Sequence, residues 1–285
     1  MNAIVTADKV SKYYGKQAAL DAISFTIAPG RIVGLIGPNG SGKTTTLKAM
    51  LGLTRFDGEL TVLGMNPRTQ RDALMREVCF IADVAVLPRW LKVRDAIDFV
   101  AGVHPRFNRA KAERYLANTK LAPDMKVKAM SKGMIVQLHL ALVMAIDARL
   151  LVLDEPTLGL DILYRKQFYQ DLLEEYFDDD KTIVITTHQI EEVEHILTDL
   201  IFIRDGKIAL SASMEEIGER YTEVMVEPQF AKAAAALAPM TERTVFGKSV
   251  MLFDGASRAQ LEKFGELRTP SVADLFVASM KGTAQ

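Results

Sequence analysis

The sequence predicts an α/β fold with a mainly parallel central sheet, an antiparallel N-terminal β region, an inserted helical subdomain and a small α+β C-terminal appendage. Strand and helix patterns alternate along much of the chain, as expected of a parallel sheet with crossover helices. The segment 149–156 (RLLVLDEP) contains an unbroken apolar run, which is typical of a strand buried on both faces. From about residue 88 to residue 147 the pattern is helical only, so this block interrupts the alternation.

The N-terminal part is predicted to contain strands around one helix. Turn residues at Gly15 and at Pro29-Gly30 divide the first strands. A glycine-rich turn then leads into 43–53, which has helical spacing. We expect strands at 2–15, 20–37, 58–64 and 76–83.

The helical block is predicted to hold three helices, and the alternation resumes after it. Helical spacing covers 93–103, 108–119 and 134–146. Beyond the block we expect strands at 149–156 and 182–188 and helices at 162–177 and 190–199. Asp205-Gly206, between the apolar runs of 200–210, predicts a tight hairpin.

The pattern changes near residue 220. We therefore expect a main domain at 1–220, with its helical subdomain at about 88–147, and a small accessory domain at 221–285. The accessory domain is predicted to run β-α-β-β-α and to end in a further helix. Its elements are expected at 222–228, 230–239, 243–247, 249–255, 258–265 and 271–282.

The composition is that of an ordinary globular protein and excludes several classes. The 285 residues are 49% hydrophobic and 25% charged, with a formal net charge of -1, whereas dedicated nucleic-acid binders usually carry a basic excess. One cysteine, Cys79, cannot form an intrachain disulfide and fits a reducing compartment. No secretory signal is visible, and no apolar run approaches the roughly 18–20 residues that a membrane span needs.

The segment Gly37 to Thr44 (GPNGSGKT) matches the phosphate-binding pattern G-x-x-x-x-G-K-[ST]. It follows a predicted strand and precedes a predicted helix, where backbone N–H groups and the helix N-terminus can hold an anion. Lys43 can reach the β- and γ-phosphates, and the Thr44 hydroxyl can bind Mg²⁺. Since a chance match is expected in about one per cent of chains this long, we predict a nucleotide phosphate site.

Three further segments carry candidate residues. Asp154 and Glu155 stand at the end of an apolar strand, and on their own they could simply cap a helix. Beside a phosphate loop, however, we expect Asp154 to bind the metal and Glu155 to act as the base for a water molecule. His188 ends another predicted strand, and a single histidine is more often structural than catalytic; His104, His139 and His195 keep that structural interpretation. In 129–145 (AMSKGMIVQLHLALVMA), Ser131 could simply cap a helix or could bind a phosphate.

The order of five motifs resembles the ATP-binding cassette (ABC) family of ATPases over roughly residues 1–220. These motifs are YYG, GPNGSGKTT, MSKGM, LLVLDEPTLGLD and TTH. The resemblance implies a P-loop NTPase cassette that works in head-to-tail pairs, with ATP between the P-loop of one chain and the serine–glycine motif of the other. It also implies ATP and Mg²⁺ as cofactors and a second cassette, expected to be a second copy, as partner.

The resemblance assigns roles by position. Tyr14 falls where an aromatic ring stacks on adenine, Ser131 and Gly133 where the partner's γ-phosphate is capped, Asp161 where paired sites communicate, and His188 where a histidine contacts the γ-phosphate. The residues expected to bind the nucleotide are Tyr14, Gly37, Pro38, Asn39, Gly40, Ser41, Gly42, Lys43, Thr44, Thr45, Ser131, Gly133 and Asp161. Glu155 and His188 are expected to be catalytic, and Thr44, Asp83 and Asp154 to hold the metal.

Two segments depart from the family pattern. The usual L-S-G-G-Q motif is here Met130 to Met134 (MSKGM), so the serine and the second glycine remain, while Lys132 adds a cation and Met134 removes an amide. Asp83 stands where a glutamine on Mg²⁺ is usual; a carboxylate is also a hard-metal ligand. This loop normally meets the membrane partner, so the departure bears on that contact.

The resemblance favours the energy-supplying subunit of a transporter that drives a separate transmembrane permease. The ending RTPSVADLFVASMKG is similar to the tail of single-cassette bacterial exporter ATPases that pair with ABC-2 permeases, so export and a cytoplasmic position on the inner membrane face are expected. A soluble ABC ATPase acting on nucleic acid or ribosomes is the alternative, but the chain lacks the long coiled coil or second cassette of such proteins. A regulatory module with little turnover would usually lack Glu155.

Overall fold

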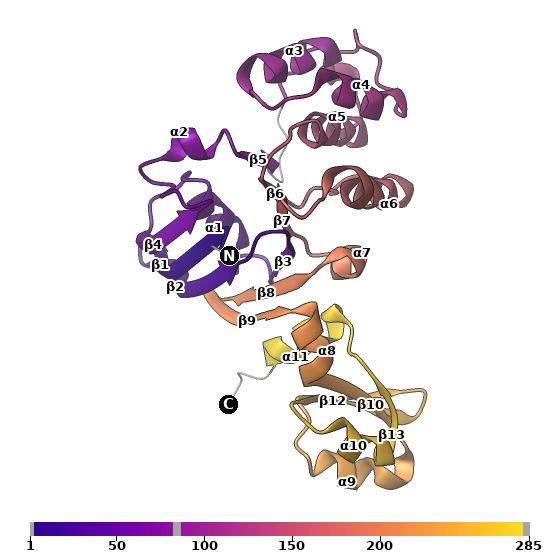
Figure 1. Cartoon of the computed structure of the whole chain (residues 1–285). Coiled ribbons are helices and arrows are strands. Elements are labelled where there is room, and N and C mark those ends of the chain that lie inside the picture. Colours follow the sequence, from indigo (N-terminus) through magenta and orange to yellow (C-terminus); the bar gives the residue numbers. More distant parts are fainter. Residues whose placement is uncertain (1–2, 82–86, 282–285) are drawn as a thin grey trace.

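The computed structural model describes residues 3–81 and 87–281 (Figure 1). Its central sheet has the strand order β5-β6-β7-β3-β8-β9, in which the first five strands are parallel and β9 runs antiparallel to β8. These strands are β3 (Ile32–Ile36), β5 (Val78–Ile81), β6 (Leu150–Asp154), β7 (Thr182–Thr186), β8 (Asp199–Arg204) and β9 (Lys207–Ser213). The predicted α/β fold with a mainly parallel central sheet is therefore confirmed.

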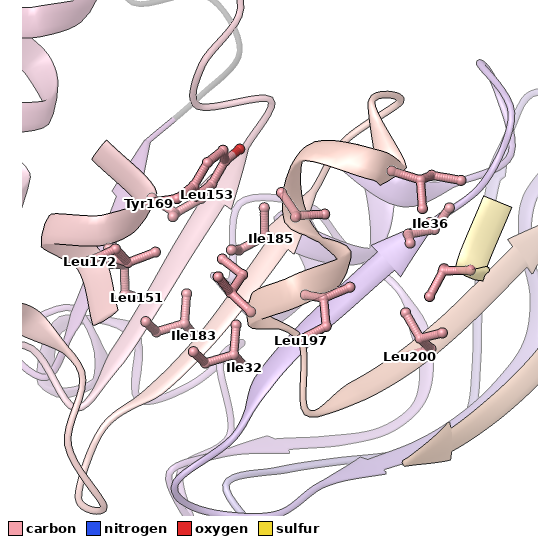
Figure 2. Packing of buried hydrophobic residues seen from close by; sticks show 14 of the residues in the cluster. Ile32, Ile36, Leu151, Leu153, Tyr169, Leu172, Ile183, Ile185, Leu197 and Leu200 are labelled. Atoms are coloured by element: carbon pink, nitrogen blue, oxygen red, sulfur yellow. The ribbon is translucent and has the colours of Figure 1, made fainter. Parts of the chain in front are cut away.

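The central strands β3, β6 and β7 are buried at every residue, so both of their faces are covered, which explains the apolar runs in their sequences. On one face, Ile183 and Ile185 of β7 pack in the same cluster as Tyr169 and Leu172 of the helical segment after β6 (Figure 2). On the other face, Val184 packs in the same cluster as Leu47 of the first helix and the N-terminal sheet. The sheet is thus held between two hydrophobic layers, and its strand ends are fixed in place.

The N-terminal β region is an antiparallel sheet of order β2-β1-β4, as predicted. Its strands are β1 (Val5–Tyr14), β2 (Gln17–Ile27) and β4 (Asp57–Val62). The helix α1 (Lys43–Met50) follows the glycine-rich turn where helical spacing begins. A short helix, α2 (Arg71–Leu74), was not predicted, since four residues are too few to show a helical period.

The helical block contains the three predicted helices and lies at one end of the molecule (Figure 1). Its elements are α3 (Val93–Val103), α4 (Arg109–Ala117), the 3-10 turn η1 (Val127–Ala129) and α5 (Lys132–Met144). Residues such as Val93, Leu116 and Leu138 form a hydrophobic cluster within the block. Leu140 and Met144 of α5 also join the core beneath the central sheet, so α5 connects the block to the sheet.

The two helices after β6 and β7 differ in length. The predicted helix 162–177 is present as α6 (Ile162–Asp171), continued by the π-helical turn η2 (Leu172–Tyr176). The predicted helix 190–199 is too long, because only α7 (Ile190–Val193) and the 3-10 turn η3 (Glu194–Ile196) form. Thr198 instead hydrogen-bonds the backbone of Ile32 through both its N–H and its hydroxyl, which draws the chain to the edge of β3.

The C-terminal part forms a separate antiparallel sheet of order β11-β12-β10-β13. Its strands are β10 (Tyr221–Val226), β11 (Thr241–Val245), β12 (Lys248–Asp254) and β13 (Gly265–Arg268); its helical elements are η4 (Pro228–Phe230), α9 (Ala231–Ala235), α10 (Arg258–Leu261) and η5 (Glu262–Phe264). The strand β13 and the helix α8 (Met214–Arg220), which directly precedes β10, were not predicted. The capping box formed by Ser213 and Glu216 is the sequence signal that could have located α8.

The last helix, α11 (Val272–Lys281), packs on the central sheet's core rather than only on the C-terminal sheet. Leu275 is fully buried in the cluster that covers the central sheet, and the Phe276 ring lies 5.3 Å from the Phe202 ring of β8. The Val272 N–H donates to the Glu194 carboxylate at 2.9 Å. The division of the chain at residue 220 stays our proposal, and α11 is the element that crosses it.

Leu275→Ala should therefore destabilise the protein by about 2–5 kcal/mol, because it removes a side chain at the point where α11 meets the core of the central sheet. Urea unfolding of the full chain measures this change. Val277→Ala on the same helix is the matched control: Val277 is 48% exposed, and its loss should change the unfolding free energy by about 0.5 kcal/mol or less. Equal effects of the two variants would contradict the packing of α11 described above.

Candidate functional site

The loop 37–42 between β3 and α1 is enclosed so tightly that two of its positions admit only glycine. A Cβ on Gly37 would lie 2.2 Å from the Ile203 carbonyl oxygen, and a Cβ on Gly42 would lie 2.6 Å from the Ala19 carbonyl oxygen. Gly42 also has φ +113°, a conformation that side chains disfavour. The glycine spacing is thus required by the close approach of β8 and β2 to the loop.

The β8–β9 turn holds this loop by backbone hydrogen bonds. The Gly206 N–H donates to the Ser41 carbonyl at 3.0 Å, and the Gly206 carbonyl accepts from the Asp21 N–H at 2.8 Å. The Ser41 N–H donates to the Pro38 carbonyl at 3.1 Å. The buried Ser41 hydroxyl has no hydrogen-bond partner within the described parts of the chain, so it is available to a bound group.

Lys43, the first residue of α1, turns its ammonium group back to the loop. Its Nζ donates to the Gly37 carbonyl at 2.7 Å and to the Pro38 carbonyl at 3.1 Å. Burial lowers the pKa of Lys43, while the nearby carboxylates of Glu155 and Asp154 oppose this change. The lysine is therefore a buried cation whose charge is supported by two acidic groups.

Asp154, the last residue of β6, links α1 to β7. Its Oδ2 accepts from the Thr44 hydroxyl at 2.9 Å, and its Oδ1 accepts from the Thr186 hydroxyl. The side chain is buried, and its charge acts to raise the pKa of the nearby Lys43. Carboxylate and hydroxyl oxygens together are suitable ligands for Mg²⁺.

A cavity of about 200 Å³ opens where these elements meet. It is lined by Ala19, Asn39, Gly40, Gly42, Lys43, Thr44, Thr45, Asp154 and Glu155. All of these except Ala19 were named from the sequence, although they come from two segments more than 100 residues apart. The cavity combines a glycine-rich loop, a helix N-terminus, a cation and two carboxylates, which is a set of groups that fits a polyphosphate with its metal ion.

Glu155 and His188 form a pair at the edge of this cavity. Glu155 Oε2 lies 2.8 Å from His188 Nδ1 and accepts more weakly from the His188 N–H at 3.4 Å. Glu155 has φ +50°, unusual for a residue with a side chain, and its N–H donates to the Thr186 carbonyl at 3.1 Å. Burial raises the pKa of Glu155, and His188 opposes this more than Lys43 does. A carboxylate tuned in this way suits a base.

Tyr14 lies near the cavity but does not line it. It ends β1 and pairs with Gln17 across the first hairpin, two residues from the cavity-lining Ala19. Its side chain is half exposed, and the Lys12 ammonium lies 5.0 Å from the centre of its ring. An exposed ring beside the phosphate loop is able to stack on a base.

Ser131 and Asp161 both act as helix caps in this structure. Ser131 Oγ accepts from the Met134 N–H at 3.2 Å, and Asp161 Oδ1 accepts from the Leu163 and Tyr164 N–H groups at 3.0 and 3.1 Å. Ser131 and Asp161 are exposed and lie outside the lining of the cavity.

The serine–glycine motif and the loop before α6 touch within one chain. A Cβ on Gly133 would lie 3.3 Å from the Gly159 carbonyl oxygen, and a Cβ on Gly159 would meet the aliphatic stem of Lys132 at 3.2 Å. The departure at Lys132 is thus accommodated because Gly159 leaves room for its stem. Asp83, the remaining predicted metal ligand, lies outside the described residues.

Sequence reasoning missed one residue of the site and one contact between two residues that it had named. Thr186 orients Asp154, and its position as the last residue of β7, level with Asp154, is the signal that could have found it. The direct pairing of Glu155 with His188 could not be expected from either motif alone, since each was assigned its role separately.

Comparisons with known proteins show which proteins this chain is similar to. A family model described as "ABC transporter" matches residues 20–158. A Nod factor export ATP-binding protein from Paraburkholderia xenovorans is 34% identical over 259 residues, covering 85% of this chain and 83% of that protein. A daunorubicin resistance ATP-binding protein from Streptomyces coeruleorubidus is 30% identical, covering 85% of this chain and 79% of that protein.

Solved structures show the same fold. The ATP-binding subunit of an ABC transporter superposes with a TM-score of 0.67 at 23% identity, covering 75% of this chain and 91% of that one. A dimeric ATP-binding cassette in a post-hydrolysis state, bound to ADP and Pi, superposes with a TM-score of 0.63 at 21% identity, covering 74% and 98%.

His188→Gln should raise the pKa of Glu155 further, because it removes the imidazole charge and hydrogen bond that oppose the effect of burial. At a fixed pH near that pKa, a larger fraction of Glu155 would then be protonated. Carbon NMR of the Glu155 carboxyl in the full chain measures the change. His195→Gln is the control, since His195 is not among the groups that shift Glu155. A lower pKa in His188→Gln would contradict the pairing.

Proposed function

Because the chain belongs to the family of ABC transporter ATP-binding proteins, we propose that it is the subunit whose ATP binding and hydrolysis drive a separate membrane permease. The observation that carries this proposal is the cavity that joins the glycine-rich loop to Asp154 and Glu155. The two relatives compared above are named for export and for drug resistance, which supports an exporter.

The residues around the cavity fit ATP with Mg²⁺. The loop positions Gly37 and Gly42 leave space only for backbone, and the Ser41 hydroxyl is free to donate to a phosphate. Thr44 and Asp154 would hold Mg²⁺, whose charge would offset that of the phosphates when bound. Lys43, which now donates to loop carbonyls, would exchange those partners for phosphate oxygens.

The Glu155 carboxylate is the group best placed to accept a proton from an attacking water. It faces the same cavity as Lys43, and its raised pKa brings it closer to the range in which a base works at neutral pH. His188 would orient this carboxylate through Nδ1, and the rest of its half-exposed ring remains open to a γ-phosphate.

A second cassette, expected to be a second copy, would complete the site. Ser131 is exposed at the N-terminus of α5, where its hydroxyl and the helix dipole can meet an anion held by another chain. Asp161 is exposed at the start of α6, so it is available to the same partner. We propose that ATP binding closes this head-to-tail pair and that hydrolysis opens it.

The proposed location is the inner face of the membrane, through contact with the permease. Across residues 3–81 and 87–281, no helix combines the length and the apolar character that a membrane crossing requires. The alternative is a soluble ABC ATPase acting on nucleic acid or ribosomes, which the formal net charge of -1 does not favour.

Glu155→Gln should lower the ATP turnover of the full chain by about 100-fold or more, since it removes the proposed base, and should trap an ATP-bound dimer. Size-exclusion chromatography with light scattering, in the presence of ATP and Mg²⁺, measures the dimer. Adding Ser131→Arg to this variant should abolish the dimer while ATP binding to the monomer persists. A dimer that survives Ser131→Arg would leave Ser131 as a helix cap only.

The permease is tested by isolating the tagged chain from gently solubilised native membranes with ATP and Mg²⁺ present. We expect a multi-span membrane protein in stoichiometric amount. Lys43→Ala is the matched control, because loss of nucleotide binding should remove any ATP-dependent part of the association. Recovery of ribosomes or nucleic acid without a membrane protein would instead support the soluble ATPase.

A further inference from the structure

Arg165 is a largely buried cation on the first turn of α6 that binds three acceptors from different segments. Its Nε donates to the Leu160 carbonyl at 2.8 Å, and its Nη1 donates to Gln189 Oε1 at 2.5 Å and to Glu192 Oε1 at 2.6 Å. The side chain is 19% exposed, and that of Glu192 is 27% exposed. We call this arrangement the Arg165 clamp.

On one side, the Arg165 clamp contacts the loop 155–160, which begins at Glu155. The Leu158 N–H donates to the Glu155 carbonyl at 3.2 Å, and the Leu160 N–H donates to the Thr157 carbonyl at 3.0 Å. These turns make 155–160 a compact unit that ends at the carbonyl gripped by Arg165. A displacement of the guanidinium would therefore shift the backbone of 155–160 and, with it, the position of the Glu155 side chain.

The other side of the clamp holds the residue next to His188. Gln189 begins α7; its N–H donates to the Thr187 hydroxyl at 3.0 Å, and its carbonyl accepts from the Glu192 N–H at 3.2 Å. The Arg165 guanidinium thus binds both ends of the short turn 189–192. Since His188 directly precedes this turn, its ring follows the position of Gln189.

The contacts close a ring through the Glu155–His188 pair. From Glu155 the ring passes through the loop to Leu160, across Arg165 to Gln189, and back through His188 Nδ1 to Glu155 Oε2. Packing alone does not fix the His188 end of that pair, because its side chain is half exposed, and Glu155 holds an unfavourable φ of +50° that the surrounding contacts must maintain.

We infer that Arg165 is a positioning residue that sets the geometry of the Glu155–His188 pair and thereby the rate of ATP hydrolysis. This inference rests on the proposed function of the chain as an ATPase. Arg165 is absent from the lining of the nucleotide cavity, so its effect falls on turnover and leaves ATP binding nearly unchanged. Its planar fork of donors serves three acceptors at once, which the single ammonium of a lysine cannot reproduce.

The first test is Arg165→Lys in the full chain, which keeps the charge and loses the fork. We expect kcat for ATP to fall by between about 10- and 100-fold, as a small misplacement of catalytic groups does, with KM within about twofold of the original. Glu192→Gln keeps an acceptor oxygen for Nη1 and should retain most of the turnover. This split separates positioning from a general loss of structure.

Two further variants provide matched controls. Lys166→Met removes the neighbouring exposed cation on α6 and should leave kcat unchanged. Tyr169→Phe removes another contact to the loop, the 3.3 Å hydrogen bond between the Tyr169 hydroxyl and Thr157 Oγ1, without touching Gln189. If holding the loop were sufficient, Tyr169→Phe would reduce kcat as much as Arg165→Lys does, and that result would overturn the inference.

Nitrogen NMR of the His188 ring in the nucleotide-free chain gives a readout that needs no turnover. The resonances are assigned by their loss in His188→Gln. Arg165→Lys should shift them, because Nδ1 loses its fixed distance from Glu155, whereas Lys166→Met should not. Unchanged resonances together with an unchanged kcat would overturn the role of Arg165. A wild-type chain without ATPase activity would refute the proposed function, while the His188 resonances would still decide the positioning role.

Discussion

The close approach of two strands to the phosphate loop is the constraint on which the site depends. With the Ile203 and Ala19 carbonyls against Gly37 and Gly42, the loop has no freedom to move into the protein. The buried central sheet therefore fixes the position of the loop. The loop in turn fixes the position of Lys43, which lies directly after it at the start of α1. Rigid placement of this kind favours electrostatic recognition of a phosphate, because the loop backbone needs no rearrangement and only the Lys43 ammonium has to change its hydrogen-bond partners.

The two adjacent carboxylates at the end of β6 have different surroundings, and this difference suits the separate roles proposed for them. Asp154 is still within the sheet and accepts hydrogen bonds from the hydroxyls of Thr44 and Thr186. Glu155 has already left the sheet through a left-handed backbone conformation, which turns its side chain to His188. The proposed metal ligand is thus held by two hydroxyl donors, whereas burial raises the pKa of Glu155, the proposed base.

The sequence was sufficient to predict the parts of the site that depend on local pattern. The glycine spacing of 37–44 indicates an anion-binding loop, and the apolar run before Asp154 indicates a buried strand. The structure places residues of both segments around one cavity. The Glu155–His188 pair and the Arg165 clamp join segments about 25 to 35 residues apart, so no periodicity or motif reveals them. The same limit applies to the fold: helix α11 has a clear helical pattern, but the face of the core that it covers depends on long-range packing.

The segment that follows His188 is held at several points, and these contacts are better explained by position than by stability. Arg165 binds Gln189 and Glu192, and Glu194 accepts from the N–H of Val272 at the start of α11. A partly buried ion pair such as Arg165–Glu192 offers little net stability, because desolvation offsets much of its attraction. What it does fix is the direction of each partner, since an arginine fork accepts few arrangements. The contacts therefore hold the turn after His188 at several points, and in our proposal they keep the imidazole 2.8 Å from Glu155 even though half of its surface faces solvent.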